Sequence, residues 1–111
     1  MSAPEVDERD VERILRRDYP EYVDEVREAI LRLSVIEKTR VVLACLKLGS
    51  GSIEKLRYQF HEAPGYYRDL LGHAETPGYM KRWSRWERLS AEERQSIEDE
   101  DRRQYEEWLR R

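Results

Sequence analysis

Residues 34–75 decide the fold, and they read SVIEKTRVVLACLKLGSGSIEKLRYQFHEAPGYYRDLLGHAE. The run Val41–Leu46 is apolar at every position, so a helix over it has no polar side. A surface helix would instead show one apolar stripe beside a polar face. We therefore expect a central, most buried helix over about 35–48, with the other helices packed around it.

The ends of this central helix carry local signals. Ser34 and Glu37 have the spacing of a capping box, in which the serine oxygen accepts from one free N–H and the glutamate reaches back to another. Gly49 is expected to end the helix in the left-handed conformation. Ser52 follows the Gly-Ser turn and is expected to cap the next helix.

Two short helical segments follow, over about 53–61 and 64–74, with a break predicted at Ala63-Pro64-Gly65. Inward apolar residues recur at the spacing of a helix-turn-helix pair, namely Leu56, Phe60, Tyr67 and Leu70. The chemistry departs from that motif, because Arg57 stands where a small residue usually allows close contact and His61 where a glycine usually allows the turn. The spacing therefore favours a helix-turn-helix-like pair that serves as an ordinary helical hairpin.

DNA binding is the alternative for this pair. The exposed start of the second segment offers one base and one acid, Arg68 and Asp69, beside Gly65 and Tyr66. A DNA reader needs several basic or amide side chains there, because phosphate contacts supply most of the affinity. The pair is therefore disfavoured as a nucleic-acid reader.

The rest of the chain also has helical patterns, over about 5–17, 20–33, 77–89 and from 91 onward, and strand patterns are absent. These patterns predict an all-α fold, a single small helical domain of five to seven short helices. We expect the domain to cover 1–90, followed by a charged helix over 91–111 that is either frayed or docked on it. Ser90 and Glu93 form a second capping box, and four acid–arginine pairs at i,i+4 are expected to support the last helix: Glu98–Arg102, Asp99–Arg103, Glu106–Arg110 and Glu107–Arg111.

The composition limits the class of protein. The chain has 111 residues, of which 41% are charged and 39% hydrophobic, so it can form one domain with a small core. Its longest apolar run, Val41–Leu46, is far too short to cross a bilayer, and the acidic start lacks the apolar region of a signal peptide. The single cysteine, Cys45, cannot form an internal disulfide. We expect a cytoplasmic protein with no membrane partner.

The charges are unevenly distributed around a net charge of −3. Residues 1–34 carry a net charge of −4, residues 35–75 of +1, residues 76–90 of +3 and residues 91–111 of −3. A mildly basic middle between acidic flanks indicates either an internal docking arrangement or a masked face that binds anions.

The basic segment 81–88 interleaves bases with two tryptophans. On the expected helix, Trp83 and Trp86 share a face with Tyr79 and Met80, while the bases lie away from it. This spacing favours tryptophans packed in the core with a basic outer face. If the stripe is instead exposed, it is a patch that binds a partner, and an acidic partner is the natural one.

No catalytic set is apparent, so we expect no enzymatic activity, no cofactor and no metal. His61 and His73 are twelve residues apart and lack accompanying ligands at metal-site spacing. Cys45 lies in the expected buried helix, where a thiol is usually an inert small hydrophobe. Residues 49–52 lack the lysine and the preceding strand of a phosphate loop.

Two runs in the middle third, Leu46–Arg57 and Tyr67–Glu75, resemble a family of small bacterial proteins of unknown function. In that family a similar leucine-rich helix, a glycine turn, a second helix and a Tyr-Arg-Asp segment recur. The resemblance implies a helical fold and a bacterial or phage origin, and it implies no activity.

Together these observations predict a small intracellular protein that interacts with an unknown protein partner or with copies of itself. The predicted partner-binding residues are Tyr79, Lys81, Arg82, Trp83, Arg85, Trp86 and Arg88, with Tyr105 and Trp108 of the last helix. The alternative is a helix-turn-helix-like nucleic-acid binder. Its phosphate contacts would be Arg57, Arg68, Lys81, Arg82, Arg85 and Arg88.

Overall fold

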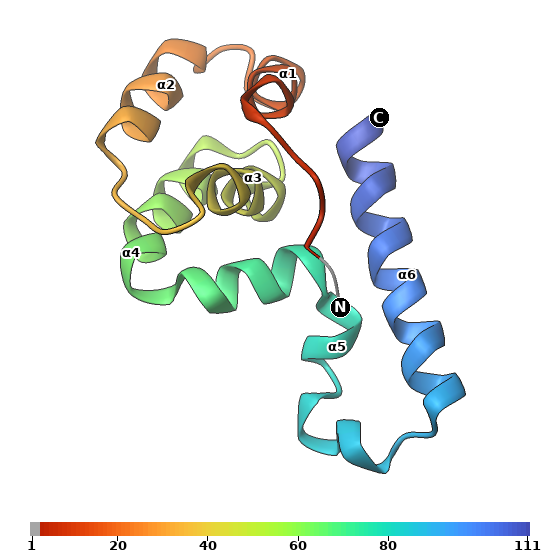
Figure 1. Cartoon of the computed structure of the whole chain (residues 1–111). Coiled ribbons are helices and arrows are strands. Elements are labelled where there is room, and N and C mark those ends of the chain that lie inside the picture. The colour runs from red at the N-terminus through yellow and green to blue at the C-terminus, as the bar shows by residue number, and fades with distance from the viewer. Residues whose placement is uncertain (1–2) are drawn as a thin grey trace.

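A computed structural model describes residues 3–111, which form six α-helices and one 3-10 helix and contain no strand (Figure 1). The elements are α1 (Glu8–Asp18), α2 (Val23–Arg32), α3 (Lys38–Gly49), α4 (Ile53–Glu75), α5 (Pro77–Met80), the 3-10 helix η1 (Trp83–Arg88) and α6 (Ala91–Arg110). The predicted all-α fold is therefore confirmed.

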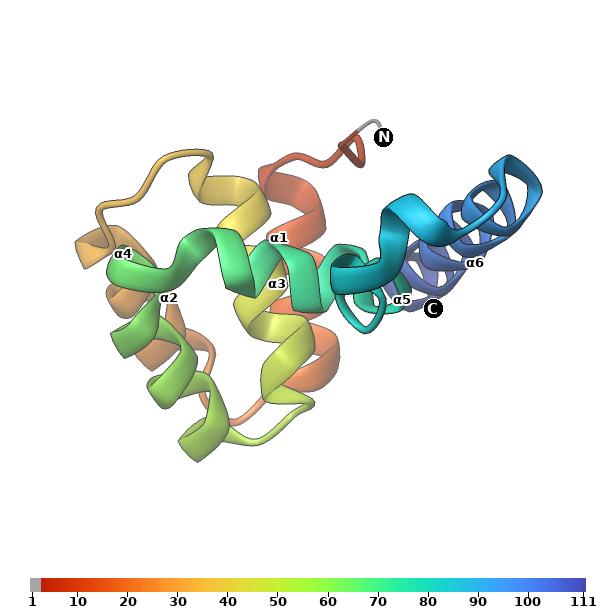
Figure 2. The same cartoon turned by 90° about the horizontal axis from the view of Figure 1, so that it is seen from below.

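Helix α3 is the centre of the molecule. Each residue of Val41–Leu46 is at most 1% exposed, as the unbroken apolar run predicts. Helices α1 and α4 pack against α3, and α2 packs against α1 (Figure 2). The predicted central helix is confirmed, although it begins at Lys38 rather than near residue 35.

The capping box predicted at Ser34 is wrong. Helix α3 has Glu37 at its N-cap, in the left-handed conformation with φ of 50°, and no side chain caps it. The Glu37 carboxylate accepts a hydrogen bond from Arg40 at 2.8 Å, and Arg40 also binds Glu75 of α4. The N-cap position thus falls three residues after Ser34, so Ser34 cannot cap the helix.

Gly49 is required for a close approach rather than for a left-handed turn, which corrects the prediction. It is the last residue of α3, and the left-handed residues are Ser50 and Gly51. A Cβ on Gly49 would lie 2.3 Å from the Tyr19 hydroxyl oxygen. That hydroxyl donates to the Leu46 carbonyl at 2.8 Å and accepts from the Gly51 N–H at 3.2 Å, so it joins the end of α1 to the α3–α4 turn.

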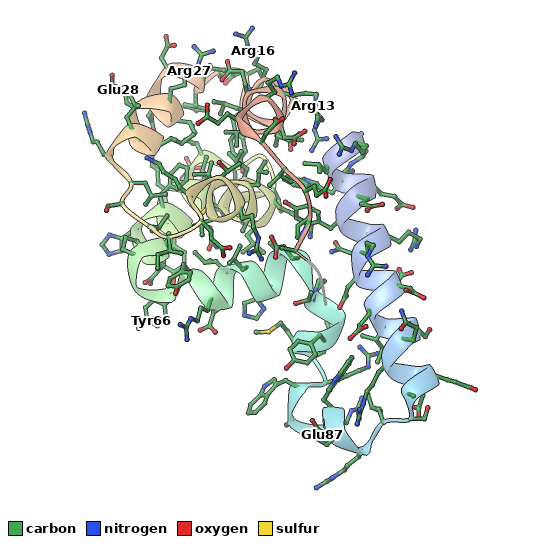
Figure 3. All side chains as sticks on the ribbon, in the orientation of Figure 1. Arg13, Arg16, Arg27, Glu28, Tyr66 and Glu87 are labelled. Atoms are coloured by element: carbon green, nitrogen blue, oxygen red, sulfur yellow. The ribbon has the colours of Figure 1, made fainter. Side chains whose placement is uncertain are left out.

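Helix α4 consists of two helical segments that meet at a sharp kink, as the predicted break indicates. The backbone leaves helical geometry at Tyr66, with φ of −132° and ψ of 27°, after the break predicted at Ala63-Pro64-Gly65. The two limbs run in clearly different directions, with Tyr66 at the bend (Figures 2 and 3). The predicted inward residues are buried or half-buried: Leu56, Phe60, Tyr67 and Leu70. Ser52 accepts from the Lys55 N–H at 3.3 Å, which confirms the predicted cap.

The first two helices are shorter than predicted. Helix α1 begins at Glu8 rather than near residue 5, because Asp7 caps it in a capping box with Asp10. Glu12 of α1 is bound by both Arg16 and Arg27, which Figure 3 shows on the adjoining sides of α1 and α2.

Within residues 3–111, no helix has the length and apolar character needed to span a membrane.

The second half of α6 docks on α1. Tyr105, Trp108 and Leu109 are buried in the common core. Arg13 of α1 donates to the Leu109 carbonyl at 2.6 Å, and Arg17 donates to the Trp108 carbonyl at 2.7 Å. These guanidinium groups satisfy carbonyls that the end of a helix leaves free.

The capping box of Ser90 and Glu93 at the start of α6 is confirmed, with both hydrogen bonds at 3.1 Å. The four predicted i,i+4 pairs do not occur among the ion pairs of residues 3–111. Arg103 instead binds Glu100 and Glu107, and Arg102 lies 3.7 Å from Asp99.

The molecule has two unlike parts. We call residues 76–100, which comprise α5, η1 and the first half of α6, the arm, and the remaining described residues the body. The arm projects from the body at the lower right of Figure 1, and the molecule measures 46 × 29 × 21 Å. No arm residue is buried, in contrast to the body.

Candidate functional site

The base of the arm is held by Asp101 of α6. This carboxylate is 3% exposed and accepts from the backbone N–H groups of Gly78 at 2.7 Å and Tyr79 at 3.0 Å. It therefore caps α5, whose first residue is Pro77. Gly78 has no room for a side chain, because a Cβ there would lie 2.7 Å from the Asp101 oxygen.

The single helix predicted over 77–89 is wrong. Helix α5 ends at Met80, and the chain continues as the 3-10 helix η1. The Gly78 carbonyl, which an α-helix would pair with the Arg82 N–H, instead accepts from the Arg82 guanidinium at 2.9 Å. The Trp86 carbonyl accepts from both the Leu89 N–H at 3.2 Å and the Arg94 guanidinium of α6 at 2.9 Å. At these two carbonyls, guanidinium donors thus replace or share the place of backbone N–H donors.

The predicted core-facing stripe is wrong, because the two tryptophans differ in exposure and neither lies in the core. Trp83 is 66% exposed. Trp86 is half-buried and meets Tyr79 edge to face, with 4.8 Å between the ring centroids and 84° between the planes. Trp86 therefore belongs to the inner side of the arm, whereas Trp83 stands on its surface.

Three bases around Trp83 form no ion pair with the described residues. Lys81, Arg85 and Arg88 are exposed and have no carboxylate within 4.0 Å among the described residues. Of the fourteen arginines outside 81–88, twelve form an ion pair. The segment 81–88 thus presents one large aromatic and three free positive charges on a surface that Asp101 and Arg94 hold in place.

The acids nearest this surface do not neutralise its three bases. Glu87 lies at the tip of the arm (Figure 3), and its nearest base is Arg94 at 3.6 Å. Glu93 is engaged by the backbone and hydroxyl of Ser90, which lower its pKa, and the positive charge of Arg85 adds to that effect.

Other residues predicted for partner or phosphate binding are occupied elsewhere. Tyr105 and Trp108 are 2% and 7% exposed and lie in the core of the body, so they form no surface with the arm. Arg57 is bound by Glu25 through two hydrogen bonds, at 2.8 and 2.7 Å. Arg68 lies over the Tyr67 ring, 5.7 Å from its centroid.

A cavity of about 660 Å³ lies where the arm joins the body, between α3, α4 and α6. Its main charged groups bind each other, since Arg40 donates to the Glu75 carboxylate at 3.1 and 2.6 Å. This carboxylate raises the pKa of Arg40. The Tyr105 hydroxyl has no hydrogen-bond partner, and burial raises its pKa. The paired Arg40 and Glu75 thus lie beside the carboxylates of Glu98 and Glu106, which also line the cavity.

The residues considered for chemistry lie apart. Within residues 3–111 there is no group of three side chains placed to bind a metal ion. Cys45 is buried, and its burial raises the pKa of the thiol to about 12, so it is not a nucleophile at neutral pH. His61 and His73 are both exposed.

Asp101 is the positioning residue that the sequence analysis missed. A signal was present, because Ile97, Asp101, Tyr105 and Trp108 follow the spacing of one helix face. An acid on the apolar face of a helix requires a partner inside the protein, and here the partners are two backbone N–H groups of α5.

No protein-family model matches this chain, and comparison with curated proteins and with solved structures finds no similar protein. The resemblance to small bacterial proteins therefore stays a prediction, and function is argued from the arm alone.

Proposed function

We propose that this chain is a small, intracellular, non-enzymatic interaction module of bacterial origin whose arm binds an acidic segment of a partner protein. The observation that carries the proposal is Trp83, exposed at 66% beside three unpaired bases. Tryptophan and arginine are the residues that most often dominate the energy of protein interfaces.

The charges of the arm favour an acidic partner. Residues 76–90 carry a net charge of +3, and Lys81, Arg85 and Arg88 form no ion pair within the described chain. An acidic partner would gain from these charges both in the rate of encounter and in specificity. Trp83 would supply the apolar contact area.

A nucleic-acid partner is the alternative, because bases stack on exposed aromatic residues. Two observations disfavour it. Arg57 is already neutralised by Glu25. The remaining bases cover one short segment rather than a continuous stripe.

A titration with labelled peptides tests the proposal. A glutamate-rich peptide should bind the protein by fluorescence anisotropy at about 50 mM salt, and Trp83→Ala and Arg85→Glu should each weaken binding about tenfold. Matched controls on the body are Lys55→Glu and Tyr58→Ala, the latter at a residue that is 59% exposed. Neither control should weaken peptide binding. Equal binding of a lysine-rich peptide, or preferential binding of oligothymidine, would overturn the proposal.

A further inference from the structure

The arm has two limbs of opposite charge. The first limb, residues 76–90, carries a net charge of +3. The second limb, residues 91–100, carries five acids and only Arg94 as a base, which is a net charge of −4. The limbs are joined at Ser90 and run back along each other (Figure 1).

The acids of the second limb face solvent. Glu92, Asp99 and Glu100 are exposed and lie seven and eight residues apart, which places them on one side of α6. They border a shallow depression on the outer surface of that helix. Glu92 has no base within 4.0 Å among the described residues, whereas Asp99 lies 3.7 Å from Arg102 and Glu100 binds Arg103. This surface is therefore the acidic counterpart of the basic limb.

The arm also lacks a core of its own. Its apolar residues Tyr79, Trp86 and Ile97 are half-buried, and none of the residues 76–100 is buried. A pair of short helical limbs needs further apolar cover to be stable, because isolated short helices are marginal in water. The arm projects beyond the body (Figure 2), so a second molecule can reach both of its limbs.

We infer that the acidic partner of the arm is the arm of a second copy of this chain, in a symmetric dimer. Around a two-fold axis, the basic limb of each copy lies on the acidic limb of the other, so one contact is made twice. Trp83 then packs against the outer side of the partner subunit's α6. This inference rests on the proposed function, because it uses the same surface.

The size of the arm sets the strength of the dimer. The half of α6 in the arm is ten residues, or about 15 Å, long. Two such arms bury a small interface of the kind found in weak complexes. Because opposite charges supply much of the attraction and salt screens them, the dimer should dissociate at micromolar concentrations and more readily as salt rises.

Exchange of charges between the limbs tests the inference. Variant A carries Lys81→Glu, Arg85→Glu and Arg88→Glu, which make both limbs negative. Variant B carries Glu92→Lys, Asp99→Lys and Glu100→Lys, which make both limbs positive. By sedimentation at about 100 µM, wild type should be dimeric, each variant alone monomeric, and an equal mixture of A and B a heterodimer. The control Lys55→Glu with Arg68→Glu, on the body, should remain dimeric.

The outcomes separate this inference from the proposed function. A monomeric wild type that still binds the glutamate-rich peptide through Trp83 overturns the dimer and leaves the proposed function standing. Failure of both measurements overturns both. A wild-type dimer whose variants A and B do not form a heterodimer overturns the pairing of limbs. Circular dichroism verifies that A and B are folded, and Trp83→Ala gives a second, uncharged route to the monomer.

Discussion

The body and the arm are stabilised by different forces. In the body, six consecutive residues, Val41–Leu46, are at most 1% exposed, and apolar burial holds the helices together. In the arm, no residue from 76 to 100 is buried, and its shape depends on polar contacts such as those of Asp101, Arg82 and Arg94. The body therefore determines stability, and the arm keeps an aromatic and several charges available for binding.

The largest effect should come from charging the core of the body. Leu46 is fully buried, and Leu46→Asp places an unpaired carboxylate there at a cost of several kcal/mol, more than a domain of this size can lose. We expect no cooperative thermal transition by circular dichroism. The matched control is Leu31→Asp, at a residue that is 79% exposed, which should melt like wild type. A cooperative melt of Leu46→Asp would show that α3 is not the centre.

Alkaline pH should weaken the body next. Burial raises the pKa of the Cys45 thiol from 9.0 to about 12 and that of the Tyr19 hydroxyl from 10.0 to about 12. Because each pKa is higher in the folded state, the stabilisation is complete below about pH 9 and is lost as the pH rises towards 12. The two losses together should reach about 4 kcal/mol near pH 11, measured by urea unfolding. Cys45→Ala should reduce the loss of unfolding free energy between pH 9 and 11. An equal loss in wild type and Cys45→Ala would show that the thiol is not responsible for it.

Two glycines compare a crowded site with an open one. Gly49→Ala brings a Cβ within 2.3 Å of the Tyr19 hydroxyl and should cost about 3 kcal/mol of unfolding free energy. Gly65→Ala meets no atom within 4 Å and lies in α4, where alanine is the better helix former, so it should stabilise by up to about 1 kcal/mol. Equal changes in melting temperature for the two variants would show that the Tyr19 hydroxyl does not exclude a side chain at residue 49.

Removal of the cap at the base of the arm should affect the arm alone. Asp101→Ala leaves the N–H groups of Gly78 and Tyr79 without an acceptor, at a cost of about 2 kcal/mol. Hydrogen exchange should accelerate over residues 76–90 and stay unchanged in α3. Asp99→Ala, on the exposed side of the same helix, is the control. Loss of protection throughout the body would mean that the two parts are not separable.

The smallest effect on stability belongs to the residue that we expect to matter most for binding. Trp83→Ala removes a side chain that is 66% exposed and should change the free energy of unfolding by less than about 0.5 kcal/mol. Trp86→Ala, by contrast, removes the ring that packs on Tyr79 and should loosen the arm. A large loss of stability in Trp83→Ala would place that indole in the fold rather than at an interface.

The sequence predicts the parts of the fold that depend on local signals. The apolar run Val41–Leu46 identifies α3, and the caps at Ser52 and Ser90 set the starts of α4 and α6. The capping box at Ser34 fails because Glu37 takes the left-handed conformation and α3 starts at Lys38, where Arg40 binds both Glu37 and Glu75. The contact with Glu75, 35 positions from Arg40, cannot be read from a local pattern.

The candidate site shows the same limit. The spacing of Trp83 and Trp86 predicts two tryptophans packed in the core, but α5 ends at Met80 and the chain continues as a 3-10 helix that leaves Trp83 66% exposed. The composition of 81–88 does identify the basic aromatic segment. Asp101 binds the turn before this segment through the N–H groups of Gly78 and Tyr79, 23 and 22 positions earlier, and only the tertiary structure shows this contact.

The docking of the last helix turn on α1 has a consequence for the order in which the chain can fold during synthesis. The bond from Arg13 to the Leu109 carbonyl joins residues 96 positions apart. Helical proteins usually fold quickly because their contacts are local, and this contact is not. A growing chain that has not yet reached Trp108 leaves one side of α1 uncovered. Completion of the body is therefore expected only after residues 108–110 have been synthesised.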